Sequence, residues 1–181
     1  MSLLDVRASI VTTLSAALPT GISVQPHRGR FDSPAEIQRF AAKAPAVLVA
    51  FVGAAMRQPG AGLAQMPANW AIYVITRDVP QLPRDAGAIA LAEALMLQIG
   101  GNCWGRDDLG APSEIRAQNL YAGSIDNLGV ALWAVTFDQL VTDPEVDVTT
   151  LNDFVTFHQD IDMAPADGQI DITETDTLPQ P

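Results

Sequence analysis

The chain has 181 residues, of which 48% are hydrophobic, and a formal net charge of −11. This length predicts one domain with appendages, and the hydrophobic content is sufficient for a core of that size. No apolar run approaches the roughly 20 residues that a membrane-spanning helix needs, so no membrane contact is expected. The single cysteine, Cys103, excludes an internal disulfide framework and fits a reducing compartment.

The charge is distributed unevenly along the chain. All ten Lys and Arg lie at or before Arg116, so residues 1–142 carry ten basic and eleven acidic side chains, a balance of −1. Residues 143–181 carry ten acidic residues and no Lys or Arg. We therefore predict a nearly neutral body, residues 1–142, followed by an acidic C-terminal arm. Recognition of a nucleic-acid sequence is not expected, because it needs clustered Lys and Arg.

A helix is predicted over residues 3–18, where apolar side chains recur at helical spacing and Ser2 is placed to cap the first turn. A short strand, residues 22–25, and a polar loop, residues 26–30, are expected to follow it.

A capping signal begins the second predicted helix. The hydroxyl of Ser33 can accept from the backbone N–H of Glu36, the Glu36 carboxylate can reach back to Ser33, and Pro34 occupies the first helical position. This helix is predicted over residues 34–43, because Pro45 ends it.

Two strands and a third helix are predicted next. Residues 46–53 are apolar on both faces and predict a central strand, with residues 69–77 as its antiparallel partner. The connection between them, residues 54–68, is long and rich in glycine, and long loops in compact domains are usually functional or mobile. We expect it either to contact a partner or to be a flexible loop. After a linker, residues 80–83, the apolar stripe of residues 84–99 predicts a helix.

Residues 114–140 predict a hairpin of two strands joined by a turn at 123–129, after a loop at 102–113. Residues 130–140 are apolar on both faces; a buried helix is the alternative, but the Val, Trp, Thr and Phe content favours a strand. The predicted fold is therefore α+β, in the order α-β-α-β-β-α-β-β, with a mostly antiparallel sheet of four to five strands packed with three helices.

Two segments of the acidic arm, residues 152–163 and 168–177, alternate weakly and predict edge strands. Ordering each residue costs on the order of 1–2 kcal/mol of backbone entropy, and the arm has few large apolar side chains to offset it. We expect the arm to be either disordered or laid against another subunit by strand addition.

No group of residues predicts catalysis. The only soft metal ligands, Cys103, His27 and His158, lack the close spacing of a zinc site, and Gly60 and Gly62 lack the rest of a phosphate-binding loop. We expect no catalytic residue, no metal and no cofactor, and hence a protein that is not an enzyme.

The body resembles the family of small tail-terminator, or tail-completion, proteins of Mu-like phages and prophages. The resemblance covers about residues 1–142 and is carried by six segments: FAAKAPAVLVAFVGA (40–54), NWAIYVITRD (69–78), GAIALAEAL (87–95), the Trp104-Gly105 doublet, IRAQNLY (115–121) and GVALWAVTFDQ (129–139). It implies a non-enzymatic virion protein that forms a hexameric ring, caps the tail tube, stops its growth and offers a docking surface to the head-neck complex.

The implied partners are further copies of the chain, the tail tube protein and a neck or head-completion protein. The implied place is the head-proximal end of the tail, after assembly in the host cytoplasm. Another head-tail connector is the alternative within this class, and a soluble enzyme or small-molecule-binding domain is the alternative outside it.

A closed ring needs head-to-tail contacts between subunits, which we expect from loops of the body and apolar residues of the arm. The candidate contact residues are Arg28, Arg30, Arg57, Gly60, Gly62, Leu63, Met66, Arg106, Phe154, Phe157, Ile170 and Ile172. Acidic arms repel one another within a Debye length of roughly 8–10 Å. Each arm is therefore expected to lie beside an arginine of a neighbour (28, 30, 57 or 106) or to project freely.

Overall fold

The structure is a computed structural model that describes residues 2–31, 33–56, 65–120, 128–142, 156–161 and 172–177, the last two segments mainly as backbone. The chain divides into two compact units, Met1–Pro144 and Glu145–Pro181.

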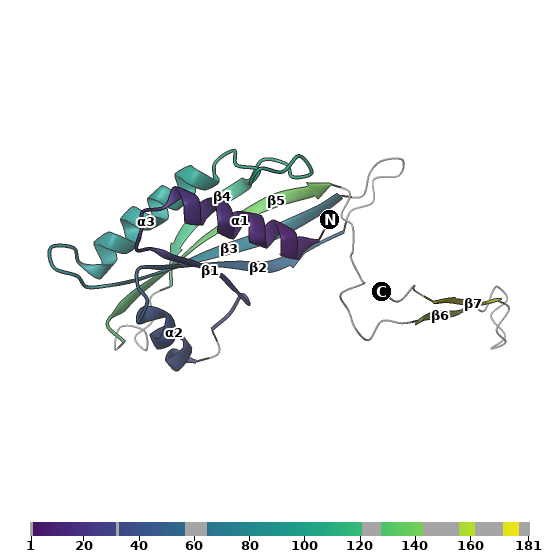
Figure 1. Cartoon of the computed structure of the whole chain (residues 1–181), viewed down its shortest axis with the longest axis horizontal. Helices are drawn as coiled ribbons and strands as arrows, with labels where there is room; N and C mark the ends of the chain where they lie inside the picture. The colour runs from purple at the N-terminus through teal and green to yellow at the C-terminus, as the bar shows by residue number, and fades with distance from the viewer. Residues whose placement is uncertain are drawn as a thin grey trace. The chain divides into compact units, whose positions relative to one another are not determined.

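The first unit has the predicted α+β fold and the predicted order of elements (Figure 1). Its elements are α1 (Leu3–Ala17), β1 (Ser23–His27), α2 (Pro34–Ala41), β2 (Ala46–Ala54), β3 (Gln65–Arg77), α3 (Arg84–Ile99), β4 (Ser113–Asn119) and β5 (Val130–Thr142).

The five strands form one sheet in the order β1-β2-β3-β5-β4. The edge strand β1 pairs with β2 in parallel, and the other three pairings are antiparallel. The central pair, β3 and β5, is in register from Gln65↔Thr142 to Arg77↔Val130. The predicted antiparallel pairings, of residues 46–53 with 69–77 and within the 114–140 hairpin, are confirmed.

The sheet is covered on both faces, which explains why its central strands are apolar on both sides. Helices α1 and α3 lie side by side on one face (Figure 1), over a core to which Val47, Trp70, Ile72, Val135 and Phe137 contribute. On the opposite face α2 packs Ile37 and Phe40 against a second core, which includes Leu48, Ile75, Val130 and Leu132. Alternation along β5 therefore feeds both cores, as a strand buried on both sides requires.

The helix starts follow their capping residues. Ser2 caps α1 and forms a full capping box with Asp5, whose pKa is lowered chiefly by the hydrogen bond from the Ser2 backbone. Helix α3 has the predicted bounds, whereas α2 ends at Ala41, two residues before the predicted end.

Two predicted loops are partly strand. β3 begins at Gln65, so Met66 and Pro67 are in a strand and not in the loop predicted through residue 68. Pro67 is tolerated because β2 ends at Ala54, opposite Ala68, which leaves β5 as the strand beside Pro67. The prediction of a polar loop at 26–30 is wrong for Pro26 and His27, which lie in β1, and His27 is only 5% exposed. Residues 57–64 and most of the predicted turn at 123–129 lie outside the described residues.

The second unit contains two strands, β6 (Thr156–Ile161) and β7 (Ile172–Thr177), within the two segments predicted as strands. They form a two-stranded antiparallel sheet in register from Thr156↔Thr177 to Ile161↔Ile172. Docking of the arm on another subunit stays a prediction. Among the described helices none has the length and apolar character to cross a membrane.

Two valines of β2 test the core assignment with the same chemical change. Val47 is fully buried, whereas Val52 is 58% exposed. We expect Val47→Ala to lower the free energy of unfolding by about 2 kcal/mol, through lost burial and the cavity left behind. The matched control, Val52→Ala, should change it by less than about 0.5 kcal/mol. Urea titration of both variants checks this, and equal losses of unfolding free energy would contradict the assignment of Val47 to the core.

Candidate functional site

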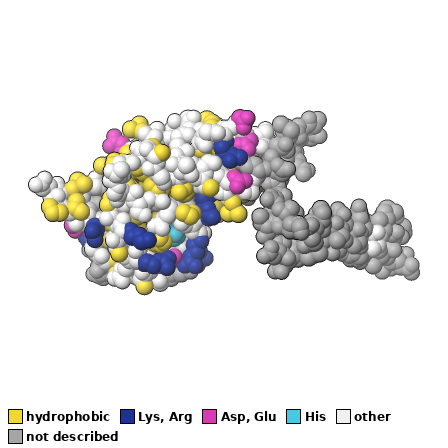
Figure 2. Space-filling view, viewed as in Figure 1, with side chains coloured by type: hydrophobic (Ala, Val, Ile, Leu, Met, Phe, Trp, Pro, Cys, Tyr) yellow, Lys and Arg dark blue, Asp and Glu magenta, His cyan; other side chains and the backbone are white. Residues whose placement is uncertain are grey.

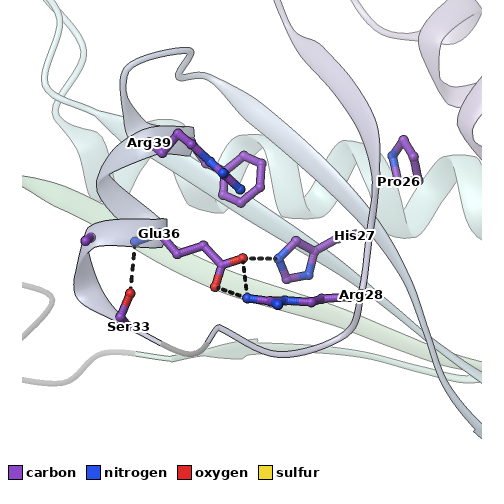
Figure 3. A pocket seen from close by; sticks show the side chains of 8 residues that line it. Pro26, His27, Arg28, Ser33, Glu36 and Arg39 are labelled. Carbon is purple, nitrogen blue, oxygen red and sulfur yellow. Dashed lines mark hydrogen bonds and ion pairs between the residues drawn. The ribbon is translucent and has the colours of Figure 1, made fainter.

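A polar pocket of about 570 Å³ lies where the end of β1 meets α2 (Figure 3). Its lining residues are Pro26, His27, Arg28, Ser33, Ala35, Glu36, Arg39 and Phe40. We call it the α2 pocket. Its volume falls within the range of about 300–1,000 Å³ that is usual for ligand-binding clefts.

Helix α2 is fixed at both its start and its inner face. The Ser33 hydroxyl accepts from the backbone N–H of Glu36 at 3.4 Å, which confirms the Ser33 half of the predicted capping box, and Pro34 lies in the first turn. Ile37 and Phe40 anchor the helix in the second core. The opposite side of α2 therefore remains at the surface and presents its polar side chains to the pocket.

The Glu36 carboxylate, assigned to the cap by the sequence, is directed at β1 and the loop after it. One guanidinium nitrogen of Arg28 donates to both of its oxygens at 3.0 Å. The Nε2 atom of His27 lies 3.8 Å from the nearer oxygen. Figure 3 shows the carboxylate facing both the His27 ring and the Arg28 guanidinium. Because the Glu36 side chain is only 11% exposed, this charge-assisted contact compensates a largely desolvated charge.

His27 is held in a ring of aromatic side chains. Its imidazole centroid lies 4.6 Å from that of Phe31, 5.4 Å from Phe40 and 5.7 Å from Tyr73. Its Nδ1 accepts from the backbone N–H of Gly29 at 3.2 Å, so the neutral ring carries its hydrogen on Nε2, on the side of Glu36.

The turn after β1 depends on Gly29, whose φ of +109° lies in the left-handed region that favours glycine. A Cβ at this position would lie 3.2 Å from the carbonyl oxygen of Phe51, so a side chain would be strained there. The Gly29 carbonyl accepts from the Tyr73 hydroxyl at 2.5 Å. This bond ties the pocket loop to β3 in the centre of the sheet.

Arg39 forms the other wall of the pocket. Its guanidinium lies 5.2 Å from the centroid of the Phe40 ring, a cation–π contact. Within the part of the chain that the structure describes, no acidic side chain lies within ion-pairing distance of Arg39. The pocket thus has two arginines and one glutamate, an arrangement suited to binding a carboxylate or another anion.

The described residues contain no group of three His, Cys, Asp or Glu side chains placed to hold a metal ion. Cys103 is half-buried in the loop after α3, and His27 belongs to the α2 pocket. The structure therefore does not bring these two predicted soft ligands into one metal cluster.

The candidate contact residues fall in different parts of the fold. Arg28 and Arg30 follow β1, and Arg28 lines the α2 pocket. Met66 is half-buried in β3 and packs against the first core. Phe157 and Ile172 lie in β6 and β7. The remaining body and arm candidates, except Arg106, lie outside the described residues: Arg57, Gly60, Gly62, Leu63, Phe154 and Ile170.

Arg106 is held by its own loop. Its guanidinium pairs with both carboxylate oxygens of Asp108, at 3.1 and 3.3 Å, and contacts the hydroxyl of Ser9. Its side chain is 24% exposed. Arg106 is therefore already compensated by a neighbouring charge, which the sequence pattern did not show.

A buried polar contact fixes this same loop to the sheet, and sequence reasoning missed it. Gln139 of β5 is 1% exposed, accepts from the Trp104 indole N–H at 2.8 Å, and donates to the carbonyls of Asn102 and Gly110. The signal was a glutamine two positions from Phe137 and from Val141, on the strand face that these two apolar residues share. All its described partners are in the loop between α3 and β4.

The outer surface of the helical layer carries exposed apolar side chains. Leu97 is 75% exposed and Ile89 50% on α3, and Leu4 is 63% exposed on α1. The same unit has an apolar groove of about 300 Å³, lined by residues after the end of α1, by residues 87–94 of α3 and by the β3–α3 turn with Val79 and Leu82. In Figure 2 hydrophobic side chains reach the surface at several places on this unit. We call these residues and the groove the outer helical surface.

No protein-family model matches the chain, and a search of curated proteins finds no significant match.

Tyr73→Phe tests the bond between the pocket loop and the sheet. We expect the free energy of unfolding to fall by about 1 kcal/mol near pH 7, because the Gly29 carbonyl loses its donor. Burial raises the pKa of Tyr73 above its ordinary value of 10.0. The stability linked to this group is thus fully present below about pH 10 and is lost as pH rises through the folded-state pKa, since the unfolded chain releases the proton first.

The measurement is urea unfolding of both proteins between about pH 8 and pH 11. The wild type should lose stability more steeply than the variant above about pH 10, with Tyr121 present in both chains. Parallel pH profiles would contradict a part-buried, hydrogen-bonded Tyr73 hydroxyl.

Proposed function

We propose that the chain is the tail-terminator protein of a Mu-like phage or prophage. In this proposal six copies form a ring that caps the tail tube, stops its growth and offers a docking surface to a neck or head-completion protein. The ring assembles in the host cytoplasm and remains in the virion at the head-proximal end of the tail. Its role is structural, without a catalytic step. The family resemblance of residues 1–142 supports it.

The observation that carries the proposal is the outer helical surface. Single exposed apolar residues are normal on proteins, but a surface with several large exposed apolar side chains and an apolar groove is typical of an interaction site. Leu97, Leu4 and Ile89 are each at least half exposed. A head-to-tail contact between this surface and a different face of the next copy can repeat until a ring closes. Such an interface typically buries about 800 Å² per partner.

Leu97→Glu tests whether this surface joins copies of the chain. The side chain is 75% exposed, so the variant should keep the fold of a single copy. We expect the dissociation constant of each subunit contact to rise at least about 30-fold, as expected when an apolar interface anchor worth about 2 kcal/mol is lost. Light scattering should shift from a ring of six times 19.2 kDa, about 115 kDa, toward single chains.

The matched control is Gln98→Glu, which introduces the same charge at the adjacent exposed position of α3. It should leave the assembly unchanged. If Leu97→Glu assembles like the wild type, the outer helical surface is not the subunit interface. If the wild type is a single chain both alone and with isolated tail tubes, the proposed function is wrong.

Electron microscopy distinguishes a terminator from another connector. Tails from a phage or prophage lacking this protein should have tubes of uncontrolled length, because a terminator is what stops polymerisation. Tubes of normal length without heads would instead indicate a neck or head-completion protein.

A further inference from the structure

We propose that the α2 pocket binds the acidic arm, residues 143–181, of a second copy of the chain. This inference rests on the proposed self-assembly, because the arm comes from a neighbouring copy. It names the surface that receives the arm and the chemistry that holds it: arginine guanidinium groups paired with carboxylates.

The positive charge of the body is concentrated around this pocket. Residues 28–43 contain four basic side chains and two acidic ones, a balance of +2. The body as a whole has a balance of −1, so the rest of it sums to −3. Figure 2 shows Lys and Arg side chains gathered over the part of the unit where Figure 1 places α2. A polyanion approaching the body is therefore steered to this side.

The pocket walls offer suitable partners for carboxylates. Arg39 contacts the Phe40 ring and has no acidic partner among the described residues. Arg28 is already paired with Glu36, yet its side chain remains 59% exposed. Arginine presents its N–H donors in a planar fork, which matches a carboxylate with two parallel hydrogen bonds.

The other candidate arginines of the body are less suitable. Arg106 is paired twice with Asp108, and the next residue along its loop, Asp107, is also acidic. Arg116 on β4 is paired with Glu114. At either site the arginine is already paired with a carboxylate. The α2 pocket also contains a carboxylate, Glu36, but it adds a second arginine, Arg39, that has no acidic partner among the described residues.

The arm has the complementary chemistry. It holds ten acidic residues and no basic residue, and its strand β7 places Glu174 and Asp176 two residues apart. Residues two apart in a strand lie on the same face, so these two acidic positions can engage one surface. The two-stranded sheet of β6 and β7 is the kind of element that is marginally stable alone in water. A charged docking surface on another copy would stabilise it.

The test is site-specific photocrosslinking in the full chain. Ala35 is exposed and lines the α2 pocket, so it is replaced by p-benzoylphenylalanine. This chain is co-expressed with a full-length second chain whose arm carries Thr175→Ser as a mass label. After irradiation and proteolysis, mass spectrometry should find the position-35 peptide joined to arm peptides, including those with the Thr175→Ser label. The crosslinker at Thr12, exposed on α1, is the control and should not capture the arm.

Charge reversal then tests the chemistry. Arg39→Glu should reduce the arm crosslink at least about tenfold. Arg116→Glu, an equal change at an exposed arginine of β4 outside the pocket lining, should leave it within about twofold. Light scattering of the same samples reports the assembly separately. A ring without arm crosslinks at position 35 overturns this inference and leaves the proposed function standing. Crosslinks only to unlabelled arms place the arm on its own copy, and equal yields in both charge variants exclude pairing with Arg39; either result overturns the inference.

Discussion

The pairing of β3 with β5 is the constraint on which the rest of the body depends. The two strands have thirteen residues each and stay in register over their whole length. Because alternate side chains feed opposite cores, a slip of one residue would exchange the set that packs under α1 and α3 with the set that packs under α2. Tyr73 of β3 holds the pocket loop, and Gln139 of β5 holds the loop between α3 and β4. The loop of the α2 pocket and the loop between α3 and β4 are thus both positioned by the β3–β5 pair.

Much of this fold is predictable from the sequence, because periodicity and capping are local properties. The apolar stripe of residues 84–99 gives a helix with the predicted bounds, and Ser33 caps α2 as expected. The start of β3 was missed because Pro67 and the preceding glycines are typical of a loop, whereas Pro67 lies where β2 has ended. The parallel pairing of β1 with β2 brings together two segments that α2 separates along the chain. No local sequence pattern predicts such a pairing.

The candidate site was less predictable, since its chemistry depends on contacts between distant residues. The sequence assigned Glu36 to a capping box, whereas the structure directs its carboxylate to Arg28 and His27. His27 looked like a polar loop residue because its aromatic neighbours, Phe31, Phe40 and Tyr73, are spread over 43 positions of the chain, from 31 to 73. The sequence does not distinguish Arg28 from Arg106 as candidate contact residues. The structure distinguishes them by their ion-pair partners and exposure: Arg28 pairs with Glu36 and is 59% exposed, whereas Arg106 pairs with Asp108 and is 24% exposed.

In the proposed assembly, one surface supplies most of the binding free energy and another sets the orientation of neighbouring copies. Apolar contact at the outer helical surface is non-directional and supplies binding free energy, whereas charge pairing at the α2 pocket sets register and depends on salt. Each copy has one pocket and one arm, so a closed ring would match every arm with a pocket. The match in charge is partial: +2 for residues 28–43 against −10 for the arm leaves −8. A pocket of this charge therefore holds only a part of the arm, while the remaining carboxylates stay solvated and keep neighbouring arms apart.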